Sequence, residues 1–318
     1  MLRRHDNVAW ARVRCVAGLC ISLVTLMLPA ALHAQSRGVY PLGMTAVGSG
    51  VTPESGFTYA NQLLFYSRDA SKADDGSTLP VSGQNTVVMD MNSFVWVSQR
   101  TLLGGAHYSA VATLPVAKNQ LVSDIHGTLS GGGGFADSYY LPFILGWNRE
   151  RTSIRVLAGF LAPTGRFTPG ANDNVGSGYW TPTLSSGQTV QLTRSGSLTF
   201  SAFELYEWHT TQEGTETSPG DTINLDYSLM QTFAFDKGPT RLQLGIAGYH
   251  QRQTTARAGP SITDEQSRER YAINAIGFAS NVVFPNQRWS VGFRFFDEFA
   301  NRASYEGHSF QLSGAVSF

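Results

Sequence analysis

The last nine residues of the chain, 310–318, alternate strictly between two kinds of side chain, and the final residue is aromatic. One face carries Phe310, Leu312, Gly314, Val316 and Phe318, and the other carries Gln311, Ser313, Ala315 and Ser317. A period of two places alternate side chains on opposite faces of a strand, so one face suits hydrocarbon and the other suits water. No residue follows to cover the edge of this strand. We therefore expect it to pair with the first strand of a closed barrel.

A terminal strand that ends on Phe318 also resembles the assembly signal of bacterial outer-membrane barrels, and the other end of the chain carries the pattern of an export signal. Four arginines precede an apolar run over 16–28, and small Ala34 stands before Gln35. The apolar run is shorter than the roughly 20 residues that a membrane-spanning helix needs. We expect residues 1–34 to be a cleaved signal peptide, with an uncleaved membrane anchor as the alternative.

Composition excludes several classes of function. Both cysteines, Cys15 and Cys20, lie in the expected signal peptide, which argues against a disulfide scaffold, a thiol nucleophile and a Cys-ligated metal. Removing four Arg and one Asp with that peptide changes the net charge from +0 to −3, and without a basic stripe we expect no nucleic-acid partner. Charged residues make up only 14% of the chain while Gly reaches 33, which favours many short strands and turns.

The connections between strand-like segments alternate in length along the chain. Short connections are predicted at 100–104, 148–151, 193–196, 236–238 and 285–288, and long ones at 68–84, 117–133, 165–178, 211–220, 252–267 and 300–306. Short turns at one end and long loops at the other are typical of an outer-membrane barrel with an even number of strands. We predict that residues 56–318 form an all-β, transmembrane, antiparallel up-and-down β-barrel of about 12 strands, with both ends at the periplasmic side.

Residues 35–55, which precede the barrel, are rich in Gly and Pro and show no strand alternation. This flexible segment is long enough to fold back into the barrel mouth, so two hypotheses stay open: it plugs the lumen, or it is a disordered leader.

Charges in the barrel wall are expected to face the lumen, because a charge on the lipid face near mid-membrane costs about 2–4 kcal/mol for Arg or Lys. This rule places Asp90, Arg155, Asp226 and Arg294 in the lumen, together with Phe94, Gln243, Tyr249, Gln251 and Phe296 for stacking and hydrogen bonding. Mixed charge with aromatic rings suits a polar aromatic solute, although these charges could instead pair and fill a narrow lumen. Phe94 and Trp96 share the parity of Asp90, so either a bulge switches the face of that strand or aromatic rings line the lumen. The direction of Glu204 stays open.

An enzyme is not expected. Some twelve-stranded outer-membrane barrels are lipases, which need a base and a nucleophile close together. His107 and Ser109 share a strand face, but the chain has no Gly-x-Ser-x-Gly elbow. The run Gly131–Gly134 lacks the following Lys of a phosphate-binding loop and is interpreted as a flexible surface loop. The remaining histidines are scattered, so we predict no catalytic residues, no metal and no cofactor.

Several short stretches, taken in order, resemble the outer-membrane family named for the meta-pathway of phenol degradation. They are Asp137 with Leu141-Pro142 and Gly146-Trp147, then 161–167 (Leu-Ala-Pro-Thr-Gly-Arg-Phe), Asn174-Val175-Gly176 with Tyr179-Trp180, Leu225-Asp226-Tyr227, and Gly245 to Gly248-Tyr249 with Gln251 and Gln253. The resemblance runs from about Gly43 to Phe318. Members of that family are regarded as outer-membrane transporters associated with the catabolism of aromatic compounds, and the family supplies no catalytic residues.

The resemblance and the barrel pattern together predict a Gram-negative outer-membrane channel for passive uptake of small aromatic or hydrophobic compounds. Another substrate-specific channel, for a nucleoside or an organic acid, and a closed structural or surface-interaction barrel are the alternatives. The expected partners are outer-membrane lipid and lipopolysaccharide, the barrel assembly machinery through Phe318, and a small-molecule solute.

Overall fold

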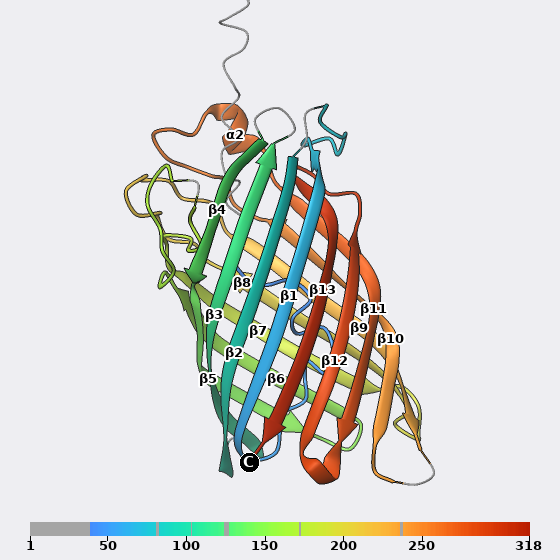
Figure 1. Ribbon diagram of the computed structural model, residues 1–318. Coiled ribbons are helices and arrows are strands. Elements are labelled where there is room, and N and C mark those ends of the chain that lie inside the picture. The colour runs from blue at the N-terminus through green and yellow to red at the C-terminus, as the bar shows by residue number, and fades with distance from the viewer. Residues whose placement is uncertain (1–38, 81–82, 103, 124–126, 172, 236–237) are drawn as a thin grey trace, which may run out of the picture. The chain divides into compact units, whose positions relative to one another are not determined.

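The computed structural model describes residues 39–80, 83–102, 104–123, 127–171, 173–235 and 238–318, and the expected signal peptide lies outside these ranges. Strands β1 to β7 span Gly56–Lys72, Gly83–Leu102, Ala106–Ser123, Gly127–Phe135, Ser138–Asn148, Thr152–Ala162 and Thr181–Gln191. Strands β8 to β13 span Leu198–Glu207, Thr222–Ala234, Arg241–Gln253, Ala272–Phe284, Trp289–Glu298 and Ser304–Ser317. A short helix, α2 (Asp264–Arg268), and a 3-10 turn at Pro285–Gln287 complete the described secondary structure (Figure 1).

The sheet closes on itself through its first and last strands. β1 pairs with β2 on one side and with β13 on the other, in a register that sets Thr58 opposite Ser317 and Phe65 opposite Phe310. β13 therefore has both edges paired, because its other neighbour is β12. The prediction that the terminal strand pairs with the first strand of a closed antiparallel barrel is confirmed.

Two of the thirteen strands, β4 and β5, are halves of one interrupted strand, so the barrel wall is twelve strands around. β4 pairs with residues 116–123 of β3, and β5 pairs with residues 107–113 of the same strand. Only Ala136 and Asp137 separate the two halves. The other edge of β4 has no strand partner among the described residues.

The predicted loop over 117–133 is wrong, because β3 and β4 continue through it as a hairpin. The glycine run Gly131–Gly134, interpreted from the sequence as a surface loop, lies inside β4. Glycine has a packing role at Gly132, where a Cβ atom would collide with the carbonyl oxygen of Asp173 in the following long connection. Gly132 thus lets a loop lie directly on this strand.

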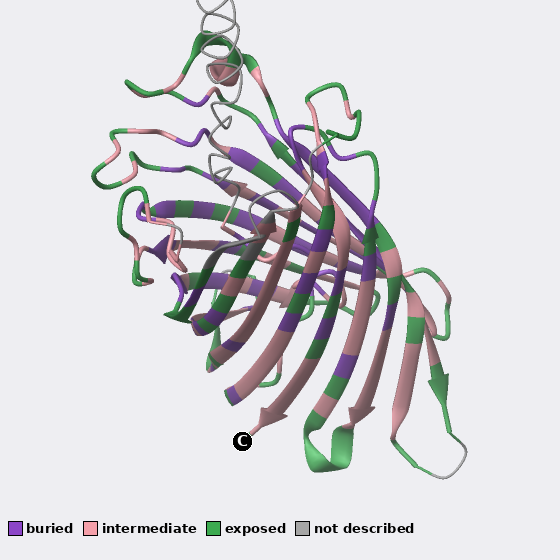
Figure 2. Ribbon diagram, turned by 45° about the horizontal axis from the view of Figure 1, so that its top comes forward, coloured by how far each residue is buried: buried purple, intermediate pink, exposed green. Residues whose placement is uncertain are grey.

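The faces of the wall follow the alternation expected from the sequence. In β9, which lies between β8 and β10, Asn224 and Asp226 are buried, whereas Ile223 is exposed. Figure 2 shows buried and exposed residues alternating along the strands. Because a side chain that faces outward has no protein around it, the exposed positions mark the outer face, where Phe310 and Leu312 lie.

Aromatic side chains gather at both ends of the outer face. Trp96 and Trp289 lie beside short turns, and Trp180 and Trp208 lie beside long connections; all four are exposed. The short connections meet at the end where the chain terminates, here called the short-turn end, and the long ones meet at the opposite, long-loop end (Figure 1). In the described part of the chain, no helix has the length and apolar character to cross a membrane.

Candidate functional site in the barrel lumen

The lumen holds residues 39–55, here called the N-terminal segment. At its start, the amides of Val39 and Tyr40 donate to Glu207 at the long-loop end of β8, and near its finish Ser55 donates to the carbonyl of Ser98 in β2 at the short-turn end. The segment therefore runs along the length of the barrel rather than dipping into one mouth. Tyr40, Leu42 and Ala46 are each at most 3% exposed, because they pack among inward-facing wall residues.

Asp226 of β9 holds the middle of the N-terminal segment. Its carboxylate accepts hydrogen bonds from the Tyr40 hydroxyl at 2.7 Å, the Gly43 amide at 3.0 Å and the Thr45 amide at 3.1 Å. The inward parity of β9 places this carboxylate in the lumen, and a turn in the segment aims two backbone N–H groups at it. Gly43 permits that turn, because its φ is +77° and a Cβ atom would lie 2.6 Å from the ring of Phe296.

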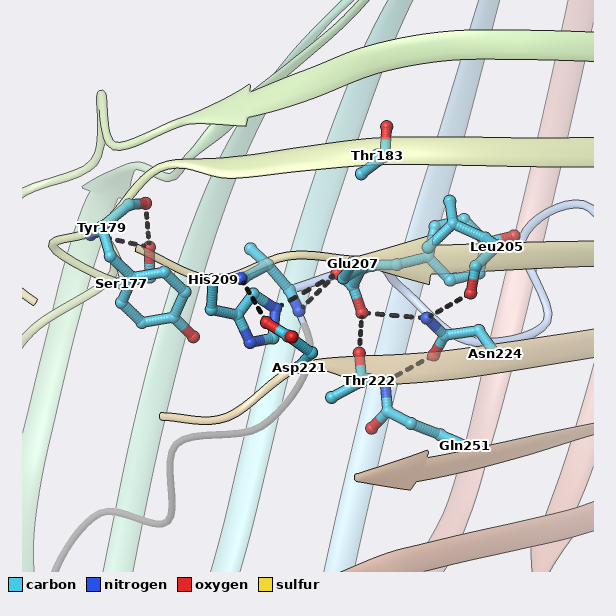
Figure 3. Close-up of polar contacts among 12 residues, drawn as sticks. Ser177, Tyr179, Thr183, Leu205, Glu207, His209, Asp221, Thr222, Asn224 and Gln251 are labelled. Atoms are coloured by element: carbon cyan, nitrogen blue, oxygen red, sulfur yellow. Dashed lines mark hydrogen bonds and ion pairs between the residues drawn. The ribbon is translucent and has the colours of Figure 1, made fainter. Parts of the chain in front are cut away.

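A second carboxylate, Glu207, holds the start of the segment at the end of a polar chain (Figure 3). One of its oxygens accepts from the Val39 and Tyr40 amides, each at 2.9 Å. The other oxygen accepts from the Thr222 hydroxyl at 2.6 Å and from the Asn224 amide at 2.9 Å, and Gln251 in turn donates to Asn224 at 2.6 Å. The buried charge is thus stabilised by four donors.

His209 extends this chain toward the loops. Its Nδ1 lies 2.6 Å from the carbonyl oxygen of Gly220, and its Nε2 lies 4.0 Å from the Glu207 carboxylate. The ring also packs on Tyr179, with centroids 5.2 Å apart. Side chains from β8, β9 and two long connections therefore converge above the start of the N-terminal segment.

The second half of the segment is held through hydrogen bonds between its backbone and side chains of the wall. Arg155 of β6 donates from Nε to the carbonyl of Ser49 at 2.7 Å, and the Gly50 amide donates to the Thr189 hydroxyl at 3.0 Å. Glycine is required opposite this contact, because a Cβ atom on Gly187 would collide with the Ser49 carbonyl oxygen. Close approach of two backbones fixes the segment against β6 and β7.

A cavity of about 250 Å³ lies between the segment and the wall at the short-turn end. It is bounded by Val47 and Val51 of the segment and by Thr189, Thr232 and Gln243 of the wall. One small aromatic molecule would fit such a volume, and its lining offers both apolar and hydrogen-bonding groups.

A third buried group lies near the long-loop end, on strands β1, β10 and β12. Tyr249 donates to Glu298 at 3.0 Å, Arg68 lies 3.6 Å from the same carboxylate, and Phe296 packs on Tyr249 with ring centroids 5.0 Å apart. Arg68 Nε makes this ion pair without a hydrogen bond, and the packed side chains fill this part of the lumen.

Seven of the nine predicted lumen residues face inward, and the N-terminal segment brings several of them together. Asp226 and Phe296 contact its turn, Arg155 binds its second half, and Gln243 lines the cavity. Arg294 faces the lumen within electrostatic range of Asp226. Tyr249 and Gln251 belong to the two buried polar groups described above.

The assignment of Asp90 and Phe94 to the lumen is corrected by the register of β1 and β2. Asp90 lies opposite Leu63 and Phe94 opposite Tyr59, both on the outer face of β1. The inward positions of β2 are apolar there, because Met91 packs with Leu64 against Met44 of the N-terminal segment. Asp90 instead accepts a hydrogen bond from the Asn61 amide on the outer face. The inward-charge rule fails where the lumen is itself a packed core.

Glu204 also faces outward, in register with Ser186, whose hydroxyl donates to it at 2.8 Å. Sequence reasoning missed Glu207, His209 and Glu298, which lie near strand ends. The available signal was parity, since Glu207 continues the buried set of Phe203 and Leu205. Among the described residues, no three His, Cys, Asp or Glu side chains gather as metal ligands would.

Comparisons with known proteins agree with this architecture. The family model described as "Putative MetA-pathway of phenol degradation" matches residues 67–313. The crystal structure of an outer-membrane channel from Pseudomonas putida F1 is similar, with a TM-score of 0.67, 14% identity, and 88% of this chain and 100% of that one covered. The β domain of the Bordetella autotransporter BrkA is also similar, with a TM-score of 0.53, 9% identity and coverages of 83% and 100%. No curated protein matches the sequence.

Proposed function

We propose that this chain, which belongs to the phenol-degradation family whose model it matches, is an outer-membrane channel for the passive uptake of small aromatic or hydrophobic compounds. The closed barrel, twelve strands around, supplies the membrane-spanning wall. The solved channel from Pseudomonas putida F1 supports the fold, and the family supports the class of solute. Residues 1–34 would serve as the export signal, and Phe318 would present the terminal strand to the assembly machinery.

The observation that carries the proposal is the way the N-terminal segment is held. It contributes no strand to the sheet, and it is bound by side chains such as Asp226, Glu207 and Arg155. Hydrogen bonds of this kind exchange with water at a net cost of about 0.5–3 kcal/mol each, so the segment can leave without breaking the barrel. The lumen behind it would then open through the cavity at the short-turn end.

The inward side chains favour an aromatic solute over a sugar. Once the N-terminal segment has left, Phe296, Tyr249 and Phe203 would line the lumen near Asp226 and Arg294, so that ring stacking and hydrogen bonding become available together. Lumen side chains set selectivity in such barrels. Solute binding by the predicted residues Arg155, Asp226, Gln243, Tyr249, Gln251, Arg294 and Phe296 is part of this proposal.

Proteoliposomes test the proposal. The refolded protein is placed in liposomes, and the uptake of 4-hydroxybenzoate is compared with that of arabinose, a sugar of similar size. We expect faster uptake of the aromatic acid and a change in that ratio in Arg294→Ala. Equal uptake of both solutes would contradict aromatic selectivity.

A closed structural barrel is the second candidate, because the segment and the inward aromatic residues fill the lumen so fully that Tyr249 and Phe296 are 0% exposed. Absence of uptake for either solute would favour it. The proposal contains no catalytic step: the Nδ1 atoms of His107, His209 and His250 each lie within 3.0 Å of a carbonyl or amide oxygen rather than a hydroxyl nucleophile.

A further inference from the structure

The cavity of about 250 Å³ at the short-turn end is formed partly by the barrel wall and partly by the N-terminal segment. On the wall side it is lined by inward side chains of five neighbouring strands, β6 to β10. On the other side it is lined by Val47, Gly48 and Val51 of the segment. A cavity with this lining therefore exists only while the segment lies in the lumen.

The segment gives the cavity an apolar surface that the protein leaves partly uncovered. Val51 is 45% exposed and Val47 is half-buried, whereas Ala46 and Ser49 are fully buried. At Gly48 a Cβ atom would meet nothing within 4 Å, so the open space continues between the two valines. Uncovered apolar surface favours a ligand that removes it from water. Because an apolar cavity of about 150 Å³ already admits benzene, this cavity has room for an aromatic ring with its substituents.

The wall side of the cavity supplies hydrogen-bonding groups and one positive charge. Gln191, Thr232 and Gln243 offer amide and hydroxyl groups, and Arg151 carries the only charge among the described lining residues. Arg151 donates from Nη2 to the carbonyl oxygens of Gln191 and Leu192, at 2.9 and 3.3 Å. These bonds hold the exposed guanidinium at the edge of the cavity, and they leave its Nε and Nη1 donors for another acceptor.

The chemistry of the ligand follows from the two sides of the cavity. An arginine that shares its cavity with no described carboxylate favours an anion, and a carboxylate accepts two parallel hydrogen bonds from a guanidinium group. The valine surface favours an apolar ring over a sugar, because sugar hydroxyls would lose hydrogen bonds to water against it. The class of ligand that fits both sides is a small aromatic acid, for which 4-hydroxybenzoate is a suitable probe.

We propose that this cavity is a binding site for a small aromatic acid, built jointly by the wall and the N-terminal segment, and that a bound acid holds the segment in the lumen. A ligand shifts a conformational equilibrium toward the state that binds it. At about ten times the Kd, the ratio of released to lumen-bound segment should therefore fall about tenfold. In the proposed channel function, on which this use of the site rests, acid that accumulates at the short-turn end would slow its own further passage.

Calorimetric titration of the protein in lipid nanodiscs measures this binding without any transport, with empty nanodiscs as the blank. 4-Hydroxybenzoate is compared with 4-hydroxybenzamide, which has the same shape without the charge, and with arabinose. We expect the acid to bind at least about tenfold more tightly than either compound. Arg151→Gln should weaken the acid by about tenfold and the amide by less than about twofold, because only the acid loses a charge-assisted hydrogen bond.

Each variant has a matched control. Arg149 is an exposed arginine of the same short turn whose Nη2 donates to the Gly104 carbonyl, but it does not line the cavity, so Arg149→Gln should leave the affinity within about twofold of wild type. Thr232→Trp places a large ring in the cavity and should abolish binding, whereas Phe233→Trp, on the exposed face of the same strand, should not. Heat-modified electrophoretic mobility confirms that each variant is a folded barrel.

Planar-bilayer recordings test the effect of the acid on the segment. At about ten times the wild-type Kd, the acid should lower the ratio of open to closed time about tenfold in the wild type and only about twofold in Arg151→Gln. A chain that lacks residues 39–51 should not respond, which separates this effect from simple block of the pore.

Four results would overturn the inference: no binding of the acid by the wild type, equal loss of acid and amide in folded Arg151→Gln, undiminished binding by the chain without residues 39–51, or a higher open ratio in the presence of the acid. All four leave the channel proposal standing, because the uptake of 4-hydroxybenzoate against arabinose tests that proposal separately.

Discussion

The Asp226 carboxylate is the contact that should decide whether the N-terminal segment stays in the lumen. It accepts three hydrogen bonds from the segment, at 2.7, 3.0 and 3.1 Å. Asp226→Asn keeps the size of the side chain, removes the charge, and turns an N–H₂ group toward backbone N–H donors. Hydrogen bonds to a charged group contribute about 1.5–3 kcal/mol each, and an amide oxygen recovers part of this.

We therefore estimate that Asp226→Asn weakens the hold on the segment by about 2–4 kcal/mol. This is a rise of about 30- to 700-fold in the population with the segment released. Single-channel recording in planar bilayers measures that population as the fraction of time spent in the high-conductance state. A chain that lacks residues 39–51 defines the fully open conductance.

Glu204→Gln is the matched control, because Glu204 is also a hydrogen-bonded carboxylate of the wall but faces outward. It should leave the open fraction unchanged. Equal open fractions for Asp226→Asn and Glu204→Gln, with the shortened chain conducting more than either, would refute this role of Asp226.

Three further outcomes follow from the geometry. Gly43→Ala should raise the open fraction more than Gly48→Ala in the same recordings. Both glycines have positive φ, which costs another residue about 1–3 kcal/mol of strain, but only at Gly43 would a Cβ atom lie 2.6 Å from an aromatic ring. Equal effects of the two substitutions would exclude the steric contact with that ring. Asp137→Asn should speed proteolytic cleavage within 163–178, because the Asp137 carboxylate accepts hydrogen bonds from the Gly165 and Ser177 amides at 3.0 and 2.8 Å and so holds both ends of this connection. Asp75→Asn, in an exposed loop, is the control. Equal cleavage rates in the two variants would contradict this role of Asp137. Asn61→Leu and Asp90→Leu together should raise the free energy of unfolding in urea by about 1–2 kcal/mol, because they replace a polar pair on the lipid face. Asp90→Leu alone should lower the free energy of unfolding, because it leaves Asn61 without its partner. A change in solute selectivity would instead place Asp90 in the pore.

The barrel could be predicted well from the sequence because the alternation of side chains is a property of each strand by itself. The terminal strand could be read as paired with the first, and the parity of Asp226, Gln243 and Arg294 follows from the cleaner apolar set on the other face of each strand. The alternating lengths of the connections identify the two ends of the barrel for the same reason.

The sequence fails where a tertiary contact decides the face or the length of a strand. Asp90 faces outward because Met44, nearly fifty residues earlier, fills the lumen beside Met91. The glycine run over 131–134 is a strand because β3 offers it a partner, although glycine itself has little preference for strands. The role of Glu207 depends on donors that the fold brings together from the N-terminal segment and from β9, and spacing along the sequence alone does not show which residues come together.

The most direct test of the account is to tether the N-terminal segment to the wall and measure uptake. Met44→Cys and Met91→Cys place one thiol on the segment and one on β2, in a part of the chain that otherwise has no cysteine. A reducible dithiol cross-linker then joins them in proteoliposomes. We expect the tether to reduce 4-hydroxybenzoate uptake to the level of protein-free liposomes, and reduction of the tether to restore it. Uptake that is unchanged by the tether would show that solute does not need the segment to leave the lumen.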